Sequence, residues 1–379
     1  MPMSRILIAL TCLLWWLPTL AVERPLPPPP DIAAKGYVLE DFHSGRVLAA
    51  HNADARLEPA SLTKIMTAYV VFKELAEGNV HLDDEVLISK KAWRTPGSRT
   101  FVEVGKRVPV EALIKGMIVQ SGNDASVALA EHIAGTEATF AELMNNYARE
   151  LGMTHSHFVN ATGLPHAGHY TTARDIARLT RALIREFPEY YKWYSLRDFR
   201  HGGITQKNRN KLLWMDPSVD GVKTGHTQSA GYCLVASAQR ASMRLISVVL
   251  GTASADARAQ ASQALLNYGF RFFETHRLYR AGQALARVRV WRGARKEVAV
   301  GPVADVWVTI PRKQYKRLAP RMELDDHLSA PVAQGRRLGR LKISLGDQVL
   351  TEAPLAALEA VPEGGLWDRA RDAVLQWWE

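Results

Sequence analysis

Three short polar motifs, far apart but in a fixed order along the chain, limit the folds that this sequence can adopt. They are Ser61-Leu62-Thr63-Lys64, Ser121-Gly122-Asn123 and Lys223-Thr224-Gly225. Ser121 follows Ser61 by 60 residues, and Lys223 follows Ser121 by 102 residues. This spacing leaves room for a helical subdomain between two parts of one sheet. A fold that uses all three motifs must therefore bring distant segments to one cleft.

The first motif places a serine three residues before a lysine. If a helix begins at Ser61, the hydroxyl and the Lys64 amine lie on one face. A serine hydroxyl becomes a nucleophile at neutral pH only with a base within hydrogen-bond reach. A desolvated lysine can lose its charge and accept that proton. Taken alone, the pattern also fits an N-cap serine followed by an exposed lysine.

The second and third motifs add polar groups and a positive charge. Ser121 and Asn123 can relay a proton and hold a substrate amide, although a polar turn that caps the next helix is the ordinary interpretation. Lys223 and Thr224 precede a run that predicts a buried strand, and a cationic strand edge suits a substrate carboxylate. Gly225 would let a substrate backbone approach closely.

The N-terminal segment, residues 1–21, has the features of a secretory signal peptide. Arg5 precedes the apolar run 6–17, and the small residues Thr19 and Ala21 follow it. The run is short for a membrane-spanning helix, so we expect cleavage after Ala21. Of the two cysteines only Cys233 would then remain, which excludes an internal disulfide.

The formal net charge of the 379-residue chain is +10, which favours acidic partners such as anionic lipid, an anionic polymer or nucleic acid. The basic residues are scattered rather than gathered in a block, which argues against a nucleic-acid-binding arm. The length exceeds what one core comfortably accommodates and indicates two domains.

Composition and apolar periodicity divide the rest of the chain into four parts, the last of which is a C-terminal helix. A stiff Pro-rich linker covers residues 22–33. An α+β domain covers residues 34–275, because strands at 37–49, 232–238 and 245–250 flank a helical middle and predict one sheet. Short β-type runs predict a small all-β, sandwich-like domain over residues 276–362. Within the α+β domain the helical patterns cover residues 61–77, 109–119, 123–133, 137–151, 172–186 and 256–268.

Residues 363–379 predict a C-terminal amphipathic helix. Interfacial helices favour Trp at the depth of lipid headgroups, so this helix is expected to attach the protein to a membrane surface through residues 364–379. The alternative is that its apolar face docks on the protein. The apolar face comprises Leu366, Trp367, Ala370, Ala373, Val374, Trp377 and Trp378.

The three motifs in this order resemble those of penicillin-recognising enzymes. The whole chain resembles the low-molecular-mass penicillin-binding proteins of the serine-type D-alanyl-D-alanine carboxypeptidase family. Residues 160–164, 170–175 and 206–214 resemble family segments, as do the β-rich domain and the terminal anchor. The resemblance implies a penicillin-binding/β-lactamase-like catalytic domain, with a helical subdomain and an antiparallel sheet with flanking helices.

The resemblance also implies a catalytic role for five residues. Ser61 would be the acylated nucleophile and Lys64 its general base. Ser121 would help to move the proton to the leaving amine, and Asn123 would orient the peptide. Lys223 would support this network electrostatically.

Five further residues would bind substrate. Thr224 and Thr227 would hold the terminal carboxylate, with Gly225 allowing close approach and Arg258 assisting. The oxyanion hole would be the main-chain N–H of the nucleophile and that of His226 or Thr227.

The implied reaction removes the terminal D-alanine from peptidoglycan stem peptides through an acyl-enzyme, without a metal or an organic cofactor. β-Lactam antibiotics would acylate Ser61 and inhibit the enzyme. The signal peptide and the terminal helix together imply a periplasmic protein held on the outer face of a bacterial inner membrane, with no nucleic-acid partner.

Three other functions fit parts of the sequence. A class A β-lactamase would need a deacylating glutamate between the second and third motifs, but Glu137, Glu142 and Glu150 fit an amphipathic helix better. A non-catalytic wall-binding protein would leave the three motifs unexplained. A zinc peptidase would need ligands with a common zinc spacing. The histidines at 155, 157, 166 and 169 lack that spacing and are expected in loops.

Overall fold

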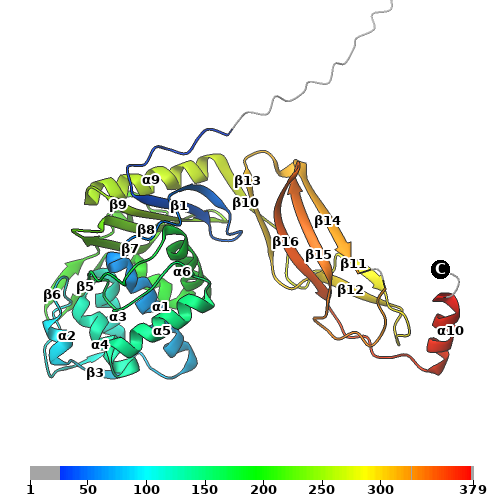
Figure 1. Ribbon diagram of the computed structural model, residues 1–379, viewed down its shortest axis with the longest axis horizontal. Helices are drawn as coiled ribbons and strands as arrows, with labels where there is room; N and C mark the ends of the chain where they lie inside the picture. Colours follow the sequence, from blue (N-terminus) through cyan, green and yellow to red (C-terminus); the bar gives the residue numbers. More distant parts are fainter. Residues whose placement is uncertain (1–25, 326, 377–379) are drawn as a thin grey trace, which may run out of the picture.

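A computed structural model describes residues 26–325 and 327–376, and it has two parts joined end to end (Figure 1). The first part combines a sheet with helices, and the second is built of strands and ends in a helix. The predicted signal peptide, the start of the predicted linker, Trp377 and Trp378 lie outside the described residues.

The first part is organised around an antiparallel five-stranded sheet with the order β2-β1-β9-β8-β7. Its strands come from both ends of the domain, as the sequence predicts. Helix α9 (Ala255–Phe272) covers one face of the sheet, and the helical subdomain lies on the other (Figure 1). The strands are β1 (Gly36–Asp41), β2 (Val47–His51), β7 (Val219–Thr227), β8 (Gly231–Arg240) and β9 (Met243–Thr252).

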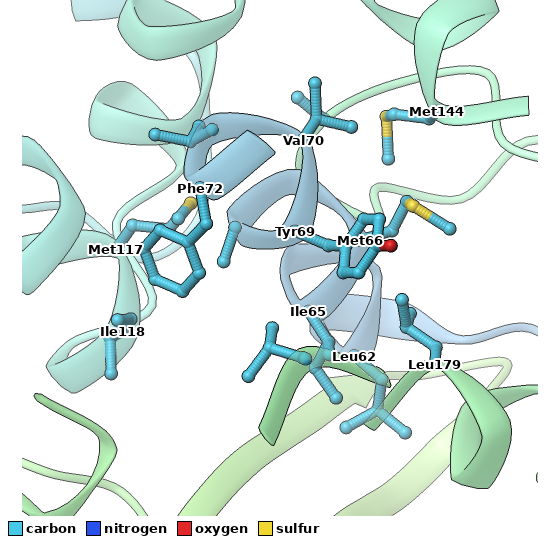
Figure 2. Packing of buried hydrophobic residues seen from close by; sticks show 14 of the residues in the cluster. Leu62, Ile65, Met66, Tyr69, Val70, Phe72, Met117, Ile118, Met144 and Leu179 are labelled. Atoms are coloured by element: carbon cyan, nitrogen blue, oxygen red, sulfur yellow. The ribbon is translucent and has the colours of Figure 1, made fainter. Parts of the chain in front are cut away.

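The helical subdomain surrounds α1 (Thr63–Glu77), which follows the 3₁₀ turn η1 (Ala60–Leu62). All ten residues from Thr63 to Phe72 are buried, because α1 is covered on every side. Figure 2 shows its apolar side chains among residues of three other helices. These helices are α3 (Val110–Val119), α5 (Glu137–Glu150) and α6 (Ala173–Glu186), and α4 (Asn123–Ala134) also packs on α1.

The predicted helices are confirmed, and side-chain caps explain where several of them begin. Thr136, Thr172 and Ser254 each accept a hydrogen bond from the N–H three residues later, which satisfies a donor that the helix leaves unpaired. Helix α1 has no such cap and begins instead from η1. The shorter elements are β3 (Glu85–Leu87), α2 (Lys90–Arg94), β4 (Arg107–Pro109), α7 (Pro188–Tyr191), η2 (Lys192–Ser195), β5 (Asp198–His201), β6 (Ile204–Lys207) and α8 (Leu212–Met215).

The second part contains a two-stranded sheet, β10-β13, and a five-stranded sheet, β11-β12-β16-β15-β14. Its core is made of aliphatic side chains such as Val298, Leu341 and Leu355. The predicted boundary at residue 275 falls within β10, which pairs with β13. The elements are β10 (Phe273–Tyr279), β11 (Ala286–Arg289), β12 (Glu297–Pro302), β13 (Val306–Pro311), η3 (Tyr315–Arg317), β14 (Leu318–Leu324), β15 (Arg337–Leu345) and β16 (Gln348–Ala357).

Hydrogen bonds and a ring stack join the two parts where β10 leaves α9. The Asp41 carboxylate accepts a hydrogen bond from Thr275 Oγ1 at 2.7 Å. The rings of His43 and Trp307 stack with centroids 4.1 Å apart. These contacts tie the turn after β1 to the β-rich part and limit the relative motion of the two parts.

The C-terminal helix α10 (Leu366–Gln376) lies at the far end of the β-rich part (Figure 1). Among residues 26–325 and 327–376, no helix has the length and apolarity needed to cross a membrane.

Candidate active site

The structure places Ser61 and Lys64 together at the start of α1. Ser61 lies in the middle of η1, and the residue before it, Ala60, has a left-handed φ of 47°. The Lys64 Nζ atom lies 3.0 Å from Ser61 Oγ. The predicted shared face therefore exists, and the serine does not act as a side-chain cap for the helix.

The Lys64 amine is buried among neutral acceptors. The residue is 1% exposed, and Nζ lies 2.7 Å from Asn123 Oδ1 and 2.6 Å from the main-chain oxygen of Thr162. Burial, together with the Arg209 charge, lowers the pKa of Lys64 to about 7, and the Asp124 charge opposes this shift.

A neutral amine fits this geometry. It has two N–H groups, which can donate to Asn123 Oδ1 and Thr162 O, and one lone pair, which then faces the Ser61 hydroxyl. In this state Lys64 can accept the proton of Ser61, as a general base must.

The loop that carries Thr162 packs directly on η1, the turn that carries Ser61. Gly163 has a φ of +83°, and a Cβ atom there would lie 1.8 Å from the main-chain oxygen of Ala60. Only glycine fits this approach. Asn160 Oδ1 accepts hydrogen bonds from the N–H groups of Thr162 and Gly163, which fixes the carbonyl that Lys64 contacts. Sequence reasoning did not find Thr162, because a main-chain oxygen has no residue signature.

Asn123 of the second motif contacts the same amine, and Ser121 lies two residues before it in the chain. Ser121 is 3% exposed with a left-handed φ of 67°, and its Oγ has no hydrogen-bond partner among the described residues. A buried hydroxyl without a hydrogen-bond partner costs free energy of folding unless a bound molecule supplies that partner. The Asn123 Nδ2 donates to Pro96 O at 2.6 Å, which turns its Oδ1 toward Lys64.

Asp124, the residue after the motif, organises the loop that covers this side of the site. Its carboxylate accepts hydrogen bonds from the main-chain N–H groups of Thr100, Phe101 and Val102 at 2.8, 2.9 and 3.3 Å. The sequence analysis did not single out Asp124, because its partners lie more than twenty residues away in the chain.

The third motif lies on β7, the edge strand of the sheet, and converges on Ser61. Lys223 and Thr224 are 3% and 5% exposed. Burial and the neighbouring Lys64 charge hold the pKa of Lys223 well below its usual range. A Cβ atom on Gly225 would lie 3.2 Å from Ser61 N, so the glycine keeps space between β7 and Ser61. An edge strand also leaves main-chain groups available to an extended peptide.

Thr227, near the end of β7, is held by a glutamate. Its Oγ1 accepts a hydrogen bond from Ala230 N at 3.0 Å and lies 3.5 Å from Glu58 Oε2. Ser229 Oγ donates to the same Glu58 oxygen at 2.5 Å. Glu58, which has no signal in the sequence, therefore lies beside the hydroxyl groups of both Thr227 and Ser229.

His226 and Arg258 have different surroundings. The His226 ring packs on Tyr232 with centroids 4.0 Å apart. Arg258 is 8% exposed, and its Nη1 donates to the main-chain oxygens of Gly225 and Cys233 at 2.9 and 3.3 Å. Arg258 thus braces β7 and β8 and adds positive charge beneath the third motif.

Arg209 adds a further charge that the sequence analysis did not assign. Its guanidinium makes no hydrogen bond or ion pair with any other described residue. It lowers the pKa of both lysines and that of Arg258 through space. Together with Arg258, it adds positive charge to the cleft, which suits an anionic substrate.

The loop histidines have structural hydrogen bonds. His169 accepts from Val159 N at Nδ1, so its Nε2 carries the proton and donates to Thr63 Oγ1 at 2.7 Å. His166 Nδ1 accepts from Gly168 N. Across the described ranges, no three His, Cys, Asp or Glu side chains are grouped as metal ligands.

Two family models match the chain. The model described as D-alanyl-D-alanine carboxypeptidase matches residues 23–254. The model described as Penicillin-binding protein 5, C-terminal domain, matches residues 273–363.

Curated relatives and solved structures agree with these matches. D-alanyl-D-alanine carboxypeptidase DacC of Escherichia coli (strain K12) is 44% identical over 354 residues, covering 91% of this chain and 88% of the relative. Penicillin binding protein 5 from Haemophilus influenzae matches with a TM-score of 0.85 and 42% identity, covering 89% of this chain and 100% of that one. Penicillin-Binding Protein D2 from Listeria monocytogenes, solved in an ampicillin-bound form, matches with a TM-score of 0.60 and 30% identity, covering 64% and 100%.

The loop contacts of Asp124 predict the effect of removing its carboxylate. Replacing Asp124 with Ala removes the acceptor of four main-chain N–H groups, the three of the loop and that of Ala125, and we expect the free energy of unfolding to fall by about 3 kcal/mol. Urea denaturation measures this change, and limited proteolysis should show faster cleavage within residues 95–106. The matched control is Asp84→Ala, which removes a half-exposed carboxylate bound to a single main-chain N–H. Equal effects of the two substitutions would contradict the role of Asp124.

Proposed function

We propose, on the premise that this chain belongs to the D-alanyl-D-alanine carboxypeptidase family, that Ser61, Lys64 and the β7 edge carry out its reaction. The protein is a serine-type D-alanyl-D-alanine carboxypeptidase of peptidoglycan remodelling, and its ligands are peptides ending in D-Ala-D-Ala and β-lactams. The observation that carries the proposal is the buried Lys64 amine, 3.0 Å from the Ser61 hydroxyl.

In the acylation step, Ser61 Oγ attacks the carbonyl carbon between the two D-alanines and passes its proton to Lys64. The developing oxyanion is stabilised by the main-chain N–H of Ser61 and by that of His226 or Thr227. The bond to the last D-alanine then breaks, and its amine receives a proton through Ser121. The buried Ser121 hydroxyl, which has no hydrogen-bond partner among the described residues, supports this relay.

In the second step, water attacks the ester carbonyl and restores the Ser61 hydroxyl. Asn123 holds the amide group of the peptide. Its side chain is suited to this role because Pro96 O and Lys64 Nζ already fix its orientation. The released product keeps the new C-terminal D-alanine. The same attack on a β-lactam carbonyl opens the ring and leaves an acyl group on Ser61.

Recognition of the terminal carboxylate is assigned to the cationic side of the cleft. Thr224 and Thr227 supply hydroxyl groups, and the Ala230 N–H and the Glu58 carboxylate contact Thr227 Oγ1. Arg209 supplies positive charge, and Lys223 supports the same network from β7. Arg258 acts from behind the strand, through its hydrogen bond to Gly225 O.

We also assign the protein to the periplasmic face of the inner membrane, attached through α10. The Asp372 carboxylate, 5% exposed, accepts a hydrogen bond from Arg292 N at 2.6 Å, so a polar side chain of the helix faces the β-rich part. Leu366 and Trp367 are 83% and 89% exposed. This orientation favours a membrane surface over docking of the apolar face on the protein.

Acylation by a labelled penicillin tests the nucleophile. Peptide mapping of the adduct should place the label on Ser61, and Ser61→Ala should abolish both labelling and D-alanine release while the fold remains intact. The control is Ser195→Ala, an exposed serine on η2, which should label normally. Label on any other residue of the parent would contradict the assignment.

The lowered pKa of Lys64 predicts the pH dependence of acylation. The neutral amine is the active form, so the acylation rate should rise with pH through an apparent pKa of about 7. Between about pH 6 and pH 8 we expect an increase of about tenfold in the rate constant for a penicillin without ionisable groups near neutrality. Stopped-flow or quenched-flow mass spectrometry measures this profile. A rate that stays flat over this range, or falls, would exclude a neutral lysine base.

The exposed apolar face of α10 predicts membrane attachment. The double substitution Leu366→Ser and Trp367→Ser should shift the protein from the vesicle-bound to the free fraction in a sedimentation assay. A truncated chain that ends at Gly364 should shift further. The matched control, Arg369→Ser, changes a half-exposed polar side chain on the same helix and should retain binding. Unchanged sedimentation of the truncated chain would overturn the anchor.

A further inference from the structure

A cavity of about 640 Å³ lies where the catalytic and β-rich parts meet, well away from Ser61. We call it the junction cavity. The catalytic side supplies Leu26, Pro27, Arg46, Arg271 and Phe272, and the β-rich side supplies Pro311, Arg312, Gln314, Arg317, Leu345 and Gln348. Its volume falls within the range of small-molecule sites, which often form at domain interfaces.

Arginine dominates the polar lining of the junction cavity. Four of its lining residues are arginines, and none is Asp or Glu. The Glu274 carboxylate lies outside this lining, 4.0 Å from the Arg312 guanidinium, and it also accepts a hydrogen bond from Lys313 N. This shared and distant carboxylate offsets the charge of Arg312 only in part, so the lining remains cationic.

Two of the arginines are held in place by main-chain carbonyls across the junction. Arg46 Nη1 donates to Thr309 O at 2.6 Å. Arg312 Nε and Nη2 donate to Phe270 O at 3.2 and 2.9 Å. Burial lowers the pKa of Arg46. A carbonyl oxygen orients a guanidinium but does not neutralise it, so these contacts preorganise the charge rather than cancel it.

The other two arginines in the lining, one from each part, are exposed. Arg271 lies at the end of α9, beside the Phe272 ring, and Arg317 lies at the end of η3. A cavity lined by charge of one sign concentrates counter-ions. Guanidinium groups match the geometry of carboxylates and phosphates.

We propose that the junction cavity binds a small organic anion through these four arginines. The ligand carries carboxylate or phosphate groups, and its apolar portion contacts Leu26, Pro27 and Phe272. Carboxylates occur on stem-peptide fragments, the compounds that this enzyme trims, and phosphates on nucleotide-like metabolites. Because the walls come from both parts, the bound anion bridges them and stabilises their relative orientation.

Calorimetric titration of the full-length protein in non-ionic detergent, at physiological salt, tests the site with citrate and with inorganic pyrophosphate. We expect at least one of them to bind with 1:1 stoichiometry and to raise the melting temperature. Binding of citrate alone identifies carboxylates as the ligand chemistry, and binding of pyrophosphate alone identifies phosphates. Absence of binding by both anions overturns the proposal.

The substitution Arg271→Ala/Arg317→Ala should weaken that binding at least tenfold. The matched control is Arg94→Ala/Arg321→Ala, which also removes one exposed arginine from each part but outside the cavity, and should bind as the parent does. Penicillin labelling of Ser61 reports whether each variant is folded. If the double variant does not fold, the single variant Arg271→Gln replaces it in the titration. Equal binding by the parent and a folded cavity variant overturns the proposal.

Discussion

Burial of the Lys64 amine with only neutral acceptors around it is the constraint on which the rest of the structure depends. A charged ammonium in that position would need a carboxylate partner, and the described contacts of Nζ are a hydroxyl, an amide oxygen and a main-chain oxygen. Desolvation therefore favours the neutral form, which is the form that can activate Ser61. Helix α1 achieves this burial because it runs through the centre of the helical subdomain, covered on all sides (Figure 2).

The helical subdomain and the sheet supply different groups to the site around this amine. The helical subdomain holds the proton-transfer groups and the loops that orient them, through contacts such as those of Asp124 and Asn160. The sheet supplies an edge strand, β7, whose Lys223 and Thr224 face the same cleft. Gly225 allows the strand to lie against the nucleophile. The close approach of these layers forms the cleft to which we assign the binding of the peptide.

Sequence reasoning predicted the elements whose determinants are local. Helices such as 137–150 have strong periodicity and a side-chain cap, and Ser61 and Lys64 are three residues apart at the start of another helix. Strands β5, β6, β10 and β14 were not predicted, because their register depends on partner strands rather than on their own pattern. Thr162 was missed because it contributes a main-chain oxygen, and Asp124 because its partners are main-chain groups far away in sequence. Arg209 was missed because only its position in the folded cleft distinguishes it from other surface arginines.

Direct titration of the Lys64 side chain by NMR tests the central claim. Lysine labelled with ¹³C at Cε, with Lys64→Arg used to assign the resonance, reports the charge of each amine. Titration of Lys64 with a pKa of about 7 in the uncomplexed enzyme would agree with this account. A Lys64 resonance that stays protonated up to the ordinary lysine range near about pH 10.4 would contradict it.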